Sequence, residues 1–185
     1  MLILRILLLS VLILQICYAY GSPSQGKIYS KNEAPHGYIP FENSFYKYHR
    51  VPQTWAKARQ ICDAEGGYLA IINSEDEANF LIQMMAKYPV DVLTDVRHKN
   101  NVLVGFHDYF EEGEFVTIDG KSLENSGYVY WAPGQPNNYG GNEQCGSLWR
   151  KGGLTDFPCA TSSPFICEIS SDTLCTIRDV ENSNQ

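Results

Sequence analysis

The chain has 185 residues, with 21 aspartates and glutamates against 14 lysines and arginines, and its formal net charge at pH 7 is −7. This surplus of negative charge argues against nucleic acid or an anionic membrane surface as a partner. A chain of this length is expected to fold as one domain that is large enough for a hydrophobic core.

The N-terminus has the pattern of a secretory signal peptide. Arg5 precedes an apolar run over residues 6–16, and Ala19 supplies the small residue that suits a signal-peptidase site. The run is shorter than the ~20 residues of a membrane-spanning helix, which favours cleavage over the alternative of an uncleaved anchor. We therefore predict a signal peptide at 1–19, a short leader at 20–36, and a secreted, extracellular product that does not insert into a membrane.

Secretion changes how the cysteines are interpreted. In an oxidising compartment they are disulfide candidates first, and thiol nucleophiles or zinc ligands second. Outside the predicted signal peptide there are five of them, so one is left over: Cys62, Cys145, Cys159, Cys167 and Cys175.

A strand hairpin and two helices are predicted in the first half of the chain. Aromatic residues over 38–49 alternate in part and indicate two strands around a turn at 42–44. A helix is predicted over 54–65, capped by its first residue, a threonine. Ser74 and Glu77 form a capping-box pattern for a second helix, whose apolar residues recur at helical spacing: Ala78, Leu81, Ile82 and Met85.

The second half of the chain predicts short strands between long loops rich in Gly, Asn and Pro. The strand candidates are 102–106, 115–118, 128–131, 145–149 and 165–168. Helices first and short strands later, separated by long loops, predict an α+β domain. The polar residues 169–185 are predicted to form a flexible tail.

Four side chains with oxygen ligands fall within 22 residues, at Gln135, Asn137, Glu143 and Asp156. A hard cation such as Ca²⁺ takes six to eight oxygens from carboxylates, amides and water. Two cysteines stand close to the last two of these side chains, and a short disulfide loop would hold the ligands in place. The sequence therefore predicts a Ca²⁺ site in this region.

Six segments together carry a resemblance to a known family: 54–62 (TWAKARQIC), 67–74 (GYLAIINS), 103–106 (LVGF), 110–115 (FEEGEF), 131–138 (WAPGQPNN) and 164–168 (PFICE). Over about residues 37–168 the chain resembles a C-type lectin-like domain, as found in the single-domain secreted lectins of invertebrates. The resemblance implies the C-type lectin fold, in which two helices flank small antiparallel sheets with long, disulfide-braced ligand loops. It also implies the disulfides Cys62–Cys167 and Cys145–Cys159.

In this family a Ca²⁺ ion beside a proline binds two neighbouring hydroxyls of a sugar, which also form hydrogen bonds with the ligands of the metal. The proline is expected to follow a cis peptide bond, here Gln135–Pro136. Carried over to this chain, the residues that bind both Ca²⁺ and carbohydrate are Gln135, Asn137, Glu143, Thr155 and Asp156. Tyr139 follows the motif, and it either stacks on the sugar or is a solvent-exposed loop residue.

The chain departs from the family at two of these positions. Amides flank the proline on both sides, whereas the family pairs a carboxylate with an amide, Glu-Pro-Asn for mannose-type and Gln-Pro-Asp for galactose-type sugars. Both sugar types therefore stay open. Only Glu143 and Asp156 are then anionic, and Thr155 replaces the usual Asn with a poorer ligand that lacks an NH₂ donor. Because Ca²⁺ affinity rises with ligand charge, we expect a weak site, with a Kd of ~10⁻⁴–10⁻³ M.

A second, auxiliary Ca²⁺ position of the family would use Asp108, Glu112, Asn138, Glu143 and Gln144. Amides replace the usual carboxylates at Asn138 and Gln144, so we expect this position to be weak or empty. Cys175 is the cysteine that the implied pairing leaves over. It either links two copies into a homodimer or is capped by a small thiol.

These observations predict a secreted, Ca²⁺-dependent lectin that binds glycans, with a role in innate immunity or agglutination that rests on the resemblance alone. The alternative is a lectin-like domain that binds a protein partner without calcium. The sequence has no nucleophile elbow, no phosphate-binding loop and no zinc signature, so we do not predict an enzyme.

Overall fold

The computed structural model describes residues 34–90 and 99–171. The predicted signal peptide, nearly all of the leader, and Cys175 with most of the tail lie outside these residues. The elements are β1 (Ile39–Phe41), β2 (Ser44–Gln53), α2 (Trp55–Ala64), β3 (Tyr68–Leu69), α3 (Glu75–Ala86), β4 (Asn101–His107), β5 (Val116–Thr117), η2 (Leu123–Asn125), η3 (Tyr139–Gly141), β6 (Cys145–Trp149), β7 (Leu154–Phe157) and β8 (Ser163–Ser170). Within the described residues, no helix is long and apolar enough to span a membrane.

The strands form one continuous sheet in the order β1-β2-β8-β4-β6-β7, with β3 added on β8 and β5 on β4. All pairings are antiparallel except that of β4 with β8, which is parallel at Leu103 and Phe165. The predicted α+β class is confirmed, but the small antiparallel sheets are joined into a mixed one. The cause is the central place of β8, which pairs with both β2 and β4.

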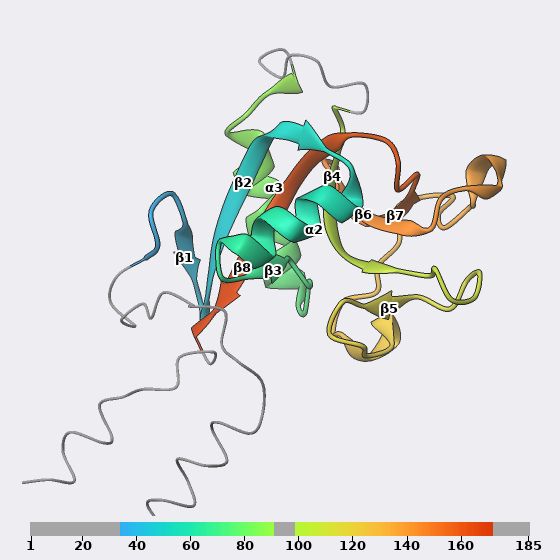
Figure 1. Ribbon diagram of the computed structural model, residues 1–185, viewed down its shortest axis with the longest axis horizontal. Coiled ribbons are helices and arrows are strands. Elements are labelled where there is room, and N and C mark those ends of the chain that lie inside the picture. The colour runs from blue at the N-terminus through green and yellow to red at the C-terminus, as the bar shows by residue number, and fades with distance from the viewer. Residues whose placement is uncertain (1–33, 91–98, 172–185) are drawn as a thin grey trace, which may run out of the picture.

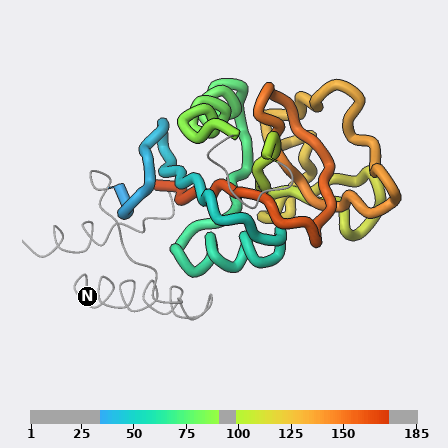
Figure 2. The backbone as a smooth tube through the Cα atoms, turned by 90° about the horizontal axis from the view of Figure 1, so that it is seen from above, coloured from blue at the N-terminus to red at the C-terminus, as the bar shows by residue number. Residues whose placement is uncertain are grey.

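The two helices cover opposite faces of the sheet, with β8 between them (Figures 1 and 2). Side chains alternate along a strand, and β4 accordingly sends Val102 and Val104 into the core beneath α3, and Leu103 into the core beneath α2. β6, β7 and the loop between β5 and β6 lie at the end of the molecule away from β1 (Figure 1). The helices and the sheet thus form a scaffold that presents these loops.

The two predicted helices begin where the sequence indicated, but their caps differ in detail. The Ser74 hydroxyl accepts the N–H of Glu77 at 3.1 Å, as predicted, whereas the Glu77 carboxylate accepts the N–H of Asn73. The Thr54 side chain forms no capping hydrogen bond. The first N–H of α2, that of Trp55, instead donates to the carbonyl of Cys159, so a distant loop replaces the predicted cap.

One strand prediction was wrong, and two strands, the two-residue β3 and β7, were missed. Residues 128–131 form no strand; Trp131 makes a single bridge to Leu154. Pro133 has no N–H and Gly134 has a φ of 81°, so the ladder ends there. The strand β7, which was not predicted, pairs with β6 and carries Asp156.

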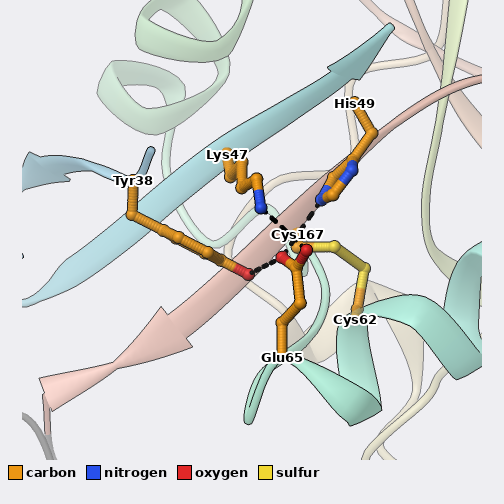
Figure 3. Close-up of a disulfide and its surroundings, with 6 residues drawn as sticks. All are labelled: Tyr38, Lys47, His49, Cys62, Glu65 and Cys167. Atoms are coloured by element: carbon orange, nitrogen blue, oxygen red, sulfur yellow. Dashed lines mark hydrogen bonds and ion pairs between the residues drawn. A yellow bond between two sulfur atoms is a disulfide. The ribbon is translucent and has the colours of Figure 1, made fainter. Parts of the chain in front are cut away.

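Both implied disulfides, Cys62–Cys167 and Cys145–Cys159, are confirmed. The first ties α2 to β8 beside a cluster around Glu65 (Figure 3). The Glu65 carboxylate accepts the Tyr38 hydroxyl at 2.8 Å and pairs with Lys47 at 2.7 Å and His49 at 3.2 Å. Although His49, Glu65 and Cys167 stand as close together as metal ligands do, the Cys167 sulfur is already bound in the disulfide.

Candidate functional site

Four of the five predicted calcium and sugar residues line one cavity of about 260 Å³, at the end of the molecule formed by β6, β7 and the ligand loop. They are Gln135, Glu143, Thr155 and Asp156. Asn101 from β4 and Trp149 from β6 line the same cavity. The fifth residue, Asn137, is exposed, and its backbone belongs to the same cluster through Asp156.

Asp156 holds the ligand loop through its carboxylate. Both of its oxygens accept the N–H of Asn137, at 3.1 and 3.0 Å, and Oδ2 also accepts the N–H of Asn138 at 2.5 Å. Asn138 has a φ of 40°, in the left-handed region that asparagine tolerates. Asp156 is buried at 3% exposure, so these charge-assisted bonds fix the loop against β7.

Glu143 closes the other side of the loop. Its Oε2 accepts the N–H of Tyr139 at 2.9 Å, and its own N–H donates to Oδ1 of Asn138 at 3.1 Å. Burial raises the pKa of the Glu143 carboxyl, and the negative charge of Asp156 raises it further. Two carboxylates that repel each other in one cavity favour a cation between them.

Gln135 places a polar atom in the interior of the site. The bond Gln135–Pro136 is cis, as predicted. Its Oε1 is buried, and among the described residues it has no hydrogen-bond donor. A buried amide oxygen without a partner is costly, and its lone pairs are of the kind that Ca²⁺ coordinates. The donor set of Gln135, Glu143 and Asp156 therefore fits a hard cation.

Thr155 is engaged in the sheet. Its Oγ1 accepts the amide N–H of Asn101 at 3.0 Å and lies 2.5 Å from Oγ of Ser147. Asn101 also donates to Ser147 at 3.0 Å. No residue pattern pointed to Asn101, because only the register of β4, β6 and β7 brings it next to Thr155.

Part of the predicted auxiliary position is also assembled. The N–H of Asp108 donates to the carbonyl of Gln144 at 3.1 Å, and its Oδ2 accepts the N–H of Gly113 at 2.8 Å. Asp108 Oδ1 is buried and has no hydrogen-bond partner among the described residues. Glu112 is exposed, and the Asn138 oxygen is taken by Glu143, so fewer ligands converge here than at the first site.

Two aromatic side chains border the site differently. Tyr139 projects from the loop with 79% of its surface exposed, which is compatible with both interpretations given above, stacking on a sugar and plain solvent exposure. Trp149 forms part of the cavity wall, and the Lys151 ammonium lies 5.5 Å from its ring centre. Lys151 itself is exposed and is not among the residues that line the cavity.

Residues 51–169 match the family model of the Lectin C-type domain. The chain is 47% identical over 126 residues to the hemolymph lipopolysaccharide-binding protein of Periplaneta americana, covering 68% of this chain and 48% of that protein. It is 30% identical to the hepatic lectin of Gallus gallus, covering 69% of this chain and 56% of that protein. The chain thus spans about half the length of these relatives.

Solved structures agree with this assignment. The carbohydrate-recognition domain of the mouse scavenger receptor C-type lectin superposes with a TM-score of 0.63 at 25% identity, covering 75% of this chain and 98% of that one. The cow CD23 domain, solved in the presence of a GlcNAc2Man3 oligosaccharide, gives 0.63 at 26% identity, covering 75% and 97%. A calcium-independent type II antifreeze protein shares the fold, with a TM-score of 0.59 at 22% identity, covering 75% and 95%.

Proposed function

This chain belongs to the Lectin C-type domain family, and we propose that it is a secreted, Ca²⁺-dependent lectin that recognises glycans on microbial surfaces. The main support is the buried Oε1 of Gln135, for which the described residues offer no hydrogen-bond donor, in a cavity that it shares with Glu143 and Asp156. A bound cation would satisfy this oxygen and balance both carboxylates.

Within this proposal, Gln135, Asn137, Glu143 and Asp156 hold the ion, which supplies a Lewis-acidic centre that binds oxygens of the sugar. The protein groups orient the glycan through hydrogen bonds. With two anionic ligands the site is weak, at a Kd of ~10⁻⁴–10⁻³ M. A calorimetric titration that gives a micromolar or tighter Kd for Ca²⁺ would contradict this charge argument.

The similarity to a protein named for binding lipopolysaccharide in hemolymph supports an extracellular role in immune recognition. In that role the chain acts by binding and not by catalysis. A single shallow site binds sugars weakly, on the order of millimolar, and two linked sites gain avidity of ~10²–10⁴. We propose that Cys175 provides the link, and non-reducing electrophoresis that shows the monomer alone would contradict it.

A second candidate is a lectin-like domain that binds a protein without calcium. One observation favours it: the Asp156 carboxylate and the Thr155 hydroxyl already have partners within the chain. A glycan array in millimolar Ca²⁺ and again in EDTA separates the two candidates. The proposed lectin binds glycans in Ca²⁺ only, whereas binding that survives EDTA, or no binding at all, contradicts it.

A further inference from the structure

We propose that the sugar recognised at this site is acidic, and that its carboxylate takes the place that a pair of neutral hydroxyls would take. This inference rests on the proposed Ca²⁺-dependent function and names the class of its ligand. Three features of the cavity carry it: its charge, its balance of hydrogen-bond donors and acceptors, and the state of the Thr155 hydroxyl.

The charge around the ion leaves room for an anionic ligand. Among the described residues, the carboxylates that line the cavity are Glu143 and Asp156, and together they balance one Ca²⁺. Gln135 and Asn137 bring no charge. A carboxylate that approaches the ion therefore meets no net negative charge from the ligands.

Acceptors for the protons of a neutral sugar are scarce. Both oxygens of Asp156 accept backbone N–H groups of Asn137 and Asn138. Oε2 of Glu143 accepts the N–H of Tyr139. When the amide oxygens of Gln135 and Asn137 face the cation, their NH₂ groups remain as donors. Among these four side chains, only Oε1 of Glu143 is then left to accept a hydroxyl proton of the sugar.

Thr155 adds a further donor. Ser147 is fully buried, and in the described part of the chain Thr155 Oγ1 is the acceptor within reach of its hydroxyl proton. In the arrangement that leaves no buried hydroxyl proton of Ser147 unpaired, Ser147 donates to Thr155, which also accepts from Asn101. Both lone pairs of Thr155 Oγ1 are thus occupied, and its own proton is left for the cavity. Thr155 then acts as a donor to the ligand and not as a calcium ligand.

A vicinal diol brings two hydroxyl protons into a site with one acceptor for them, whereas a carboxylate brings acceptors only. A buried hydroxyl proton without a partner weakens binding by about tenfold. A carboxylate also pairs with the donors of Gln135, Asn137 and Thr155 through charge-assisted hydrogen bonds. Asn101, through its bond to Thr155, is a positioning residue for this specificity.

The test compares matched sugars on the full-length protein in millimolar Ca²⁺. Glucuronic acid is compared with glucose and galacturonic acid with galactose, and the methyl esters of both acids serve as uncharged controls. We expect each acid to bind about tenfold more tightly than the matched neutral sugar and the methyl ester. We also expect EDTA to abolish the binding of the acids. Neutral sugars that bind as tightly as the acids would overturn the inference and leave the proposed function intact. Absence of any Ca²⁺-dependent binding would refute the proposed function and this inference with it.

Two variants separate charge from hydrogen bonding. Gln135→Glu restores a third carboxylate, and we expect it to bind Ca²⁺ about tenfold more tightly and to lose the preference for acids. Thr155→Val keeps the shape but removes the donor and also the acceptor of Ser147 and Asn101, so its melting temperature should fall. At a temperature where the variant is folded, its Ca²⁺ affinity should stay within about twofold, while acid binding falls by about fivefold. Thr155→Ser retains the hydroxyl, so it should keep the wild-type affinity for Ca²⁺ and for the acidic sugars. A tenfold loss of Ca²⁺ affinity in folded Thr155→Val, with the affinity kept in Thr155→Ser, would show that Thr155 is a calcium ligand and overturn its role as a donor.

Discussion

The side chain of Asp156 on β7 accepts the backbone N–H of Asn137 with both carboxylate oxygens, at 3.1 and 3.0 Å. A single buried residue therefore fixes the loop and contributes charge to the proposed Ca²⁺ site. A hydrogen bond to a charged group contributes about 1.5–3 kcal/mol to stability. The bonds to Asp156 therefore hold the loop in its conformation before a ligand binds.

The first prediction concerns this dual role. Asp156→Asn keeps the size of the side chain but replaces an accepting oxygen with a donating NH₂ that faces a backbone N–H. We expect Ca²⁺ affinity to fall at least tenfold and the free energy of unfolding to drop by about 1–3 kcal/mol. Calorimetry and urea unfolding measure the two effects. Wild-type Ca²⁺ affinity in the variant would remove Asp156 from the ligands.

The second prediction concerns the pH dependence of Ca²⁺ binding. Burial, and secondarily Asp156, raise the pKa of Glu143, so this carboxyl takes up a proton at a higher pH than an ordinary glutamate. Because Ca²⁺ binds the charged form, its affinity should fall on acidification while the fold persists. Titrations between pH 8 and pH 4.5, with melting curves at each pH, check this. Affinity that stays constant over this range contradicts it.

The third prediction concerns two buried carboxyls in the scaffold. Tyr46 donates its hydroxyl to Glu77 at 2.8 Å and lies 3.4 Å from Glu168. Burial, followed by the charge of Glu168, raises the pKa of Glu77 to about 7, and burial also raises that of Glu168. A raised carboxyl pKa stabilises the fold at low pH, and this contribution is lost as pH rises from the usual value of 4.5 to about 7.

We therefore expect the stability of Glu77→Gln relative to the wild type to be greater at pH 8 than at pH 4, by about 1–3 kcal/mol. This comparison cancels the cost of the amide NH₂ that faces the N–H of Asn73, which Oε2 of Glu77 accepts in the wild type. The amide can still accept the Tyr46 hydroxyl. Urea unfolding at both pH values gives the difference, with Glu75→Gln as the control, because Glu75 lies on the same helix and is exposed. A stability difference between Glu77→Gln and the wild type that is the same at pH 8 and pH 4 would contradict the prediction.

The fourth prediction separates the two disulfides. Removing Cys62–Cys167, which closes 105 residues, should cost up to about 4.7 kcal/mol, and removing Cys145–Cys159, which closes 14, up to about 3 kcal/mol. Only the second bridge lies beside Glu143 and Asp156. We therefore expect its double alanine variant to bind Ca²⁺ more weakly than the wild type even under conditions where the variant is fully folded. A double alanine variant that binds Ca²⁺ like the wild type would contradict this.

The sequence was most informative where the signal is local. The Ser74 cap and the apolar spacing of α3 could be predicted because a helix is specified by residues three and four apart. The strand β7 could not be predicted, since its residues are extended because they pair with β6 and not because of a local pattern. The same holds for Asn101, which meets Thr155 across 54 positions in the sequence. Long-range register therefore decides the part of the site that residue patterns leave open.

The most direct test of a calcium-centred site is a crystal structure grown in millimolar calcium chloride. We predict one ion coordinated by side-chain oxygens of Gln135, Asn137, Glu143 and Asp156 at about 2.3–2.6 Å, with Thr155 still bonded to Asn101. Well-ordered water alone between these four side chains, in crystals that contain the metal, would contradict the account.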